Sequence, residues 1–295
     1  MENGVEFGGI SGLDFDAAMG HYIAISDDRS EKGPARFYEV AVDDDGAGLK
    51  GVAVVKQVTL KDKNGEPFAR RTADPESVRL GRDGIYWGSE GDGKALIVPF
   101  VRVASQDGAF MREFKLPEDF APTADKSTGI RDNLAFEDLA IAPSGDVFVG
   151  IEANRRHSMS IQSRRSHRRP RWLTVATTTA MSEIIALDDH RLLAVERSYA
   201  QGVGNNVKIF MIDLDGAADV SAIASLAKTD QRVVPVCKSQ VLDLRAAGLV
   251  PDNIESMAIG KVKDGSDALV LGSDNNFSTS QKTQFYVFKI RRRPQ

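Results

Sequence analysis

The chain has 295 residues, of which 42% are hydrophobic, and its 38 Lys and Arg face 42 Asp and Glu. This length is sufficient for a large core, and an all-β propeller of this size folds as a single domain. One cysteine excludes a disulfide framework and a cysteine-based zinc cluster, and four histidines leave little scope for His-rich metal chemistry. The net charge of −4 gives no reason to expect nucleic acid or a membrane as a partner.

One sequence unit recurs five times and predicts a β-hairpin each time. Each copy has a short apolar segment with a small or acidic residue, a polar turn, and a strongly apolar strand that ends in acidic or amide residues. Val, Ile, Tyr, Phe and Trp are typical of strands, and Asp, Gly and Ser are typical of the turns between them. In chain order the copies are 8–29, 74–92, 136–154, 182–199 and 254–277.

Further strand-like segments follow most copies, so that each repeat has up to four strands. These segments are 35–42, 52–60, 95–103, 207–214, 236–244 and 283–290. Four strands per repeat and a period near 60 residues are typical of a β-propeller. We therefore expect one all-β domain over residues 1–295 with five recognisable four-stranded blades, and a sixth if the long connections supply it. A β-sandwich would not need the same acid-ended hairpin five times.

Short helices are expected only at 219–227 and 242–248, and Cys237 is expected to be a small buried residue in a strand.

The repeat fails around 154–181, which predicts a disrupted third blade. Residues 154–171 contain seven Arg, two His and no acid. Three interpretations stay open: a disordered basic insert that replaces the outer strands, an anion-binding or nucleic-acid-binding arm, or a frame-shifted stretch of the gene. Without residues 153–181, 31 basic residues face 42 acidic ones and the net charge is −11.

Acidic residues recur at two positions of the repeat. The first strand of each propeller blade lines the central channel, so equivalent residues of different blades converge there. The leading acids, which we take as candidate catalytic residues, are Glu76, Glu137, Glu183 and Glu255. The groups that end the second strands, which we take as candidate metal ligands, are Asp27, Asp28, Glu90, Glu152, Glu196, Asp274 and Asn275.

Crowded carboxylates repel one another, which raises their pKa values or demands a cation. Ligand sets made only of oxygen suit Ca²⁺, or Mg²⁺ as the alternative, rather than Zn²⁺. The competing interpretation is that single acids at strand ends cap turns and bind backbone amides.

Three other side chains are candidates for substrate binding. Arg29 and Arg197 each follow a strand-ending acid, and Tyr199 lies two residues further along the fourth copy. Each arginine would meet an anionic substrate or, alternatively, form a salt bridge with a neighbouring carboxylate. No G-x-S-x-G elbow, P-loop or H-E-x-x-H motif is present.

The motifs GGISGLDFD, DPESVRL, NLAFEDLAI, SEIIALDDHRLLAVERSY, PDNIESMAIG and LVLGSDNNF, taken in order, resemble the phytase-like domain family, described as having esterase-like activity of phytase. The resemblance fails only from about 154 to 181. It implies a secreted or periplasmic propeller that acts on esters or phosphoesters, and it adds Asp138 to the candidate ligands. No signal peptide is visible at the start, which by itself predicts a cytoplasmic protein.

These observations predict a monomeric hydrolase that uses a divalent metal to cleave phosphate monoesters or other esters of small molecules at a carboxylate-lined channel. Two alternatives remain: a non-enzymatic propeller that binds a ligand or protein around a structural Ca²⁺, and a lactonase-type propeller enzyme.

Overall fold

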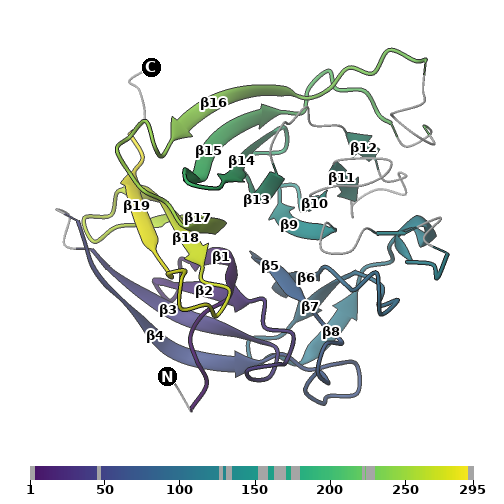
Figure 1. Ribbon diagram of the computed structural model, residues 1–295, viewed down its shortest axis with the longest axis horizontal. Coiled ribbons are helices and arrows are strands. Elements are labelled where there is room, and N and C mark those ends of the chain that lie inside the picture. Colours follow the sequence, from purple (N-terminus) through teal and green to yellow (C-terminus); the bar gives the residue numbers. More distant parts are fainter. Residues whose placement is uncertain are drawn as a thin grey trace. The chain divides into compact units, whose positions relative to one another are not determined.

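Figure 1 shows the computed structural model of the chain, in which nearly all regular structure is β-strand. The structure describes residues 4–44, 48–125, 129–130, 135–151, 159–162, 171–173, 180–220, 223 and 230–291. Within these ranges the single helix is the short 3-10 helix η1 (Glu118–Phe120). No helix in the described part of the chain has the length and apolar character needed to span a membrane.

Strands that follow one another in the sequence pair with one another in five sheets (Figure 1). The first contains β1 (Ile10–Asp16), β2 (His21–Ser26), β3 (Arg36–Asp44) and β4 (Leu49–Thr59). The second contains β5 (Pro75–Gly81), β6 (Gly84–Ser89), β7 (Phe100–Ala104) and β8 (Phe110–Glu113). The third contains β9 (Phe136–Ile141), β10 (Val147–Ile151), β11 (Met159–Gln162) and β12 (Arg171–Leu173).

The fourth sheet contains β13 (Ala180–Ala186), β14 (Arg191–Ala200), β15 (Gly204–Asp213) and β16 (Cys237–Asp243). The fifth contains β17 (Asn253–Lys261), β18 (Asp267–Asp274) and β19 (Phe285–Lys289). A succession of such up-and-down sheets with almost no helix is the β-propeller class, in which each sheet is a blade. The predicted fold class is therefore confirmed.

In the first blade an inner strand is more buried than the outer strand, and this difference explains why the sequence predicts the hairpins so clearly. In the first blade nearly every residue of β2 is buried, whereas nearly every residue of β4 is exposed or half-buried. A strand buried on both faces reads as a continuous apolar run, and an outer strand does not. The inner two strands of each repeat therefore carry the strongest signal.

The chain divides into two compact units. Unit 1 contains Met1–Tyr86, Val103–Arg112 and Asp252–Gln295. Unit 2 contains Trp87–Arg102 and Glu113–Pro251.

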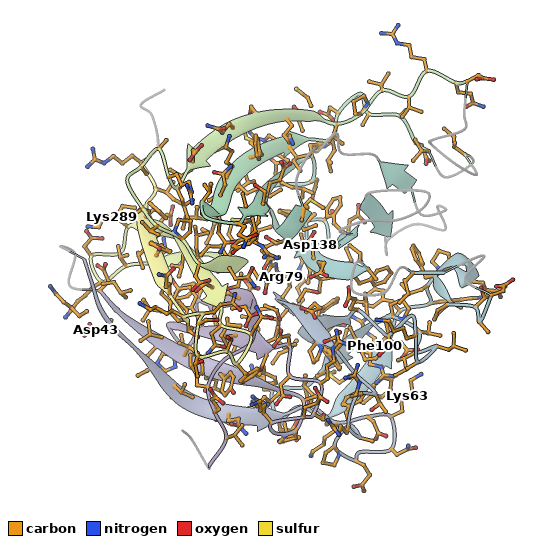
Figure 2. The ribbon with its side chains drawn as sticks, viewed as in Figure 1. Asp43, Lys63, Arg79, Phe100, Asp138 and Lys289 are labelled. Carbon is orange, nitrogen blue, oxygen red and sulfur yellow. The ribbon has the colours of Figure 1, made fainter. Side chains whose placement is uncertain are left out.

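In unit 1 the first strands β17, β1 and β5 lie side by side. The buried residues around them form a core cluster that consists of Ile10, Leu13, Tyr22, Ala24, Tyr38, Val40, Ala258 and Val270. Strands β1 and β5 approach so closely that a Cβ atom added to Gly12 would lie 2.8 Å from the backbone N of Val78. Arg79, labelled in Figure 2, is buried on β5 and donates to the carbonyl oxygen of Leu13 on β1.

In unit 2 the first strands β9 and β13 pack against each other. Their core cluster consists of Ala140, Ala142, Phe148, Met181, Ile184, Leu192, Ala194, Ile212, Leu214, Ala217 and Val236. Strands β14 and β15 pair from Arg191↔Asp213 to Ala200↔Gly204 and form the long hairpin of this unit. Within each unit, the first strands are thus neighbours, as the repeat predicts.

Several local expectations are wrong or changed. Residues 242–248 form no helix, because β16 continues to Asp243 and a turn follows it. Cys237 is exposed, since it begins an outer strand. The third sheet has two outer strands: β11 lies inside the arginine-rich segment 154–171 and β12 begins at its last residue, and the remainder of that segment lies outside the described residues. The fifth sheet has three strands in the described part of the chain. Most of 219–227 is likewise outside the description.

Candidate functional site

Asp27 lies close enough to three other carboxylates of unit 1 for their charges to act on it. Asp27 follows β2, Asp74 precedes β5, Glu255 lies on β17 and Asp274 ends β18. Burial raises the pKa of Asp27 well above its ordinary value, and the negative charges of Asp274, Glu255 and Asp74 raise it further. Crowding of this kind is relieved by a proton or by a bound cation.

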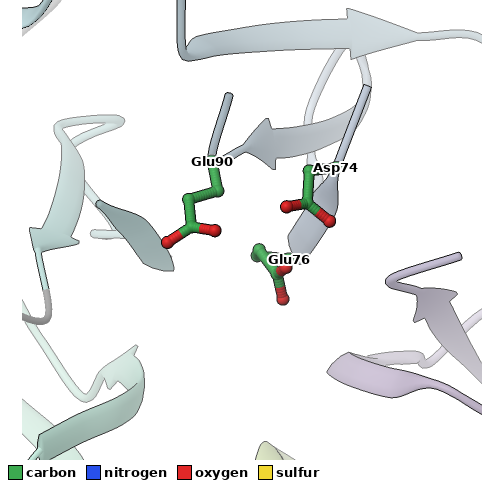
Figure 3. A group of neighbouring side chains, drawn as sticks. All are labelled: Asp74, Glu76 and Glu90. Carbon is green, nitrogen blue, oxygen red and sulfur yellow. The ribbon is translucent and has the colours of Figure 1, made fainter. Parts of the chain in front are cut away.

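The hairpin formed by β5 and β6 carries a second arrangement of acids, drawn in Figure 3. Asp74 precedes β5, Glu76 lies within it, and Glu90 follows β6. One carboxylate oxygen from each residue lies within 4.8 Å of the other two. Asp74 and Glu90 are buried and Glu76 is half-buried. Asp74 thus belongs to both arrangements.

The donor set of these acids fits a hard divalent cation. Every potential ligand is a carboxylate oxygen, which Ca²⁺ and Mg²⁺ prefer and which does not favour Zn²⁺. Three such oxygens within 4.8 Å are close enough to share one ion. The side chains present therefore fit the predicted metal by their chemistry, and they do not distinguish Ca²⁺ from Mg²⁺.

Neighbouring groups hold these carboxylates in place. The Arg29 guanidinium forms an ion pair with Asp74 at 2.5 Å and is 25% exposed. Asn253 Nδ2 donates to Glu255 Oε1 at 2.9 Å. In unit 2 the backbone N of Ala135 donates to Glu90 Oε1 at 2.8 Å. Arg29, predicted to meet substrate or form a salt bridge, does form the salt bridge and still reaches solvent.

Asp28 has its own partners, although it directly follows Asp27. Arg36 Nη1 donates to Asp28 Oδ2 at 2.6 Å, and the backbone amides of Glu31, Lys32 and Gly33 donate to the same carboxylate. Burial alone would raise the pKa of Asp28, but the bonds from Arg36, Lys32 and Glu31 hold it below its ordinary value. We therefore leave Asp28 out of the proposed ligand set.

A β-bulge recurs in the first strand of four sheets, and its position shows which residues of the repeats are equivalent. Between paired neighbours, one residue of each first strand has no partner in the register: Ser11, Glu137, Ser182 and Glu255. Bulges of this kind redirect side chains and are common beside functional sites. Glu183 therefore lies one residue after the position of Glu137 and Glu255, and it is equivalent to Asp138. The sequence alignment that placed Glu183 with Glu137 is wrong by one residue.

The remaining acids belong to unit 2. Asp138 and Glu183 are buried, and Glu137 is half-buried. Glu183 Oε1 accepts from the backbone N of Ile184 at 2.9 Å. Glu196 is paired with Lys238, whose ammonium also lies over the ring of Phe210. Glu152 lies outside the described residues.

The two other predicted substrate contacts lie on β14. Arg197 is half-buried, opposite Ala180 at the start of β13. Tyr199 is 69% exposed, beyond the part of β14 that pairs with β13. The structure thus gives Tyr199 a surface position on the long hairpin.

Sequence reasoning missed Asp74, which joins both arrangements of acids. The signal was present: Asp74 stands two residues before Glu76, and Asn253 stands two residues before Glu255. Both side chains contact the acidic group, so a polar residue at this repeat position marks it.

The comparisons with known proteins give one family. Residues 5–277 match the family "Phytase-like: Esterase-like activity of phytase". Comparison with curated protein sequences gives no match.

Among solved structures, a glucose dehydrogenase aligns with a TM-score of 0.44 and 11% identity over 98% of each chain. A putative oxidoreductase (glucose dehydrogenase) from Thermus thermophilus aligns with a TM-score of 0.40 and 14% identity over 95% of this chain and 84% of that one. A gluconolactonase from Xanthomonas campestris aligns with a TM-score of 0.39 and 10% identity over 91% and 84%. The family match covers most of the length, and the chain is a member of the phytase-like family described as having esterase-like activity of phytase.

Proposed function

We propose that this protein is a divalent-metal-dependent hydrolase of small-molecule esters, with phosphate monoesters as the first substrate class to test. The observation that carries the proposal is the position of Asp74, which lies both among the acids that raise the pKa of Asp27 and in the three-carboxylate group with Glu76 and Glu90. Membership of a family described by esterase-like activity supports the same reaction class.

In this proposal the metal ligands are drawn from Asp27, Asp74, Glu76, Glu90, Glu255 and Asp274. When bound, Ca²⁺ or Mg²⁺ supplies a positive charge that polarises an ester or phosphoryl oxygen.

The chain's own side chains supply the proton chemistry and the orientation. The proposed catalytic carboxylates would move the proton, whereas Asp27 is placed among the metal ligands, because burial and the neighbouring negative charges that raise its pKa favour a bound cation there. Arg29 is held by Asp74 and its side chain is 25% exposed, so its guanidinium is placed to meet an anionic group of the substrate as well. Glu76 and Glu255 remain the proposed catalytic carboxylates of unit 1, and Glu137 and Glu183 those of unit 2.

The experiment measures release of p-nitrophenol from p-nitrophenyl phosphate and p-nitrophenyl acetate, with added Ca²⁺, with Mg²⁺ and with EDTA. Metal-dependent turnover is expected, with a loss of at least about 100-fold in Glu255→Gln, because removal of one charge-stabilising group has effects of this size. Glu39→Gln is the matched control, since Glu39 forms a surface pair with Lys56 on the outer strands of the first blade.

Equal background rates in the wild type, Glu255→Gln and Glu39→Gln would overturn the proposal. If the melting temperature then still rises with Ca²⁺, the acids hold a structural ion in a binding protein. A lactone substrate in the same panel separates lactonase activity from phosphatase activity.

A further inference from the structure

The loop after β18 lies against the chain segment that precedes β1. Asn275 is the centre of this contact: its Oδ1 accepts from the backbone N of Gly9 at 3.0 Å and from the backbone N of Phe277 at 3.2 Å. Asn275 was predicted to be a metal ligand through this same oxygen. In the structure the oxygen instead joins two distant segments of unit 1.

The segment Gly8–Gly9 is held from a second side by β2 and its end. Ser26 Oγ donates to the carbonyl oxygen of Gly8 at 2.9 Å. The backbone N of Asp27 donates to the carbonyl oxygen of Gly9 at 2.8 Å. Gly9 is therefore bonded to Asn275 through its amide and to Asp27 through its carbonyl.

The Asp27 carboxylate lies directly over the Cα atom of Gly9. A Cβ atom at Gly9 would overlap Asp27 Oδ1 and would lie 2.7 Å from the Phe277 ring. Gly9 also has φ +65°, a conformation that L side chains rarely adopt. A side chain at residue 9 would thus displace the acid whose pKa the surrounding carboxylates raise.

The loop keeps this geometry at some conformational cost. Asn276 and Phe277 are consecutive non-glycine residues with φ of 48°. The backbone N of Asn276 donates to Asp274 Oδ1 at 2.8 Å, and that of Ser278 donates to the Asn275 carbonyl at 2.8 Å. The same turn that orients Asn275 therefore also orients Asp274.

We propose that Asn275 is a positioning residue which, through Gly9, fixes the Asp27 carboxylate beside Asp274 in the arrangement that binds the metal. This inference rests on the proposed function, because it assigns Asn275 a purpose in holding that site. Asn275 is then not a metal ligand. It links the loop that follows β18 to the segment that precedes β1.

Calcium binding by isothermal titration calorimetry tests the inference on the full chain. Asn275→Ala is expected to raise the Kd for Ca²⁺ about 10-fold or more, the usual effect of removing a residue that orients metal ligands. Asn275→Asp keeps an acceptor oxygen and is expected to stay at least as tight as the wild type. Ser278→Ala is the matched control, since its hydroxyl forms hydrogen bonds with Ser280 in the same loop.

Two further measurements distinguish a loss of positioning from a loss of stability. The melting temperature of each metal-free variant reports stability, and hydrogen exchange at the Gly9 amide reports the link itself, which is expected to exchange faster in Asn275→Ala. A lower melting temperature with an unchanged Kd would overturn the inference and leave Asn275 a purely structural residue. Absence of Ca²⁺ binding in the wild type would instead overturn the proposed function, and the inference with it.

Discussion

Replacing Arg36 with methionine is expected to lower the free energy of unfolding by about 3 kcal/mol. Arg36 is 0% exposed and donates to Asp28, Tyr38 and the backbone carbonyls of Pro34 and Glu6. Removing one partner of a buried ion pair leaves the other charge uncompensated, which has a typical cost of about 3–5 kcal/mol. The lower end applies here, because three backbone amides still donate to Asp28.

The matched control is Arg70→Met. Arg70 pairs with Glu31 at 2.6 Å, the same distance as Arg36 and Asp28, but its side chain is 73% exposed. An exposed pair of this kind contributes at most about 1 kcal/mol. The two substitutions therefore remove the same kind of ion pair at the same distance, one buried with further hydrogen bonds and the other exposed.

The assay is urea unfolding followed by tryptophan fluorescence and by circular dichroism, with the free energy taken only where the two transitions coincide. The pH dependence gives a second reading. Because the folded pKa of Asp28 lies below its ordinary value, this carboxylate stabilises the protein above pH 4, and the stabilisation is lost as pH falls through the folded pKa. The loss of unfolding free energy in Arg36→Met should thus be largest at pH 7 and become smaller towards pH 3. Equal losses in Arg36→Met and Arg70→Met would refute the reasoning.

Three further outcomes are expected. Gly12→Ala should lower stability by about 1–3 kcal/mol in urea unfolding, because no Cβ fits against β5, whereas Gly51→Ala on the outer strand meets nothing within 4 Å and should leave stability unchanged. Burial and the charge of Asp44 raise the pKa of Tyr22 to about 12, so Tyr22 should ionise late in an ultraviolet titration. The stability due to its neutral phenol, complete below pH 10, should fall as pH rises towards 12. Cys237 is exposed and should react with Ellman's reagent in the native protein at one equivalent per chain; protection until denaturation would contradict its position on the outer strand.

The sequence predicts the inner hairpins of the fold well, for a physical reason. Second strands such as β2 and β18 are buried on both faces, so their residues are almost all apolar and the turns beside them are sharply polar. Residues 154–171 show no alternation of apolar residues, so the sequence does not predict β11 and β12. The turn at 242–248 could not be told from a helix, since tertiary pairing of β16 decides it.

The residue types of the site are predictable, but the identity of each ligand is not. Asp27 and Asp28 are adjacent acids after one strand, and only the fold shows that Asp28 turns to Arg36 while Asp27 joins Asp74, Glu255 and Asp274. The one-residue shift at Glu183 follows from a bulge, which is set by strand pairing and leaves no mark in a single sequence. Asn275 has the right donor atom for a metal, and a backbone amide 266 residues away occupies it.

That sequence separation has a consequence for folding. Unit 1 combines Met1–Tyr86 with Asp252–Gln295, and β1 packs against β17. Contacts between such remote segments form slowly, because a long loop must close before any of them can stabilise the chain. On the ribosome, Asp27 emerges long before Asp274, so the acidic group cannot be assembled until synthesis has passed the fifth sheet. The metal binding that we propose should therefore be acquired late in refolding, when the two segments join.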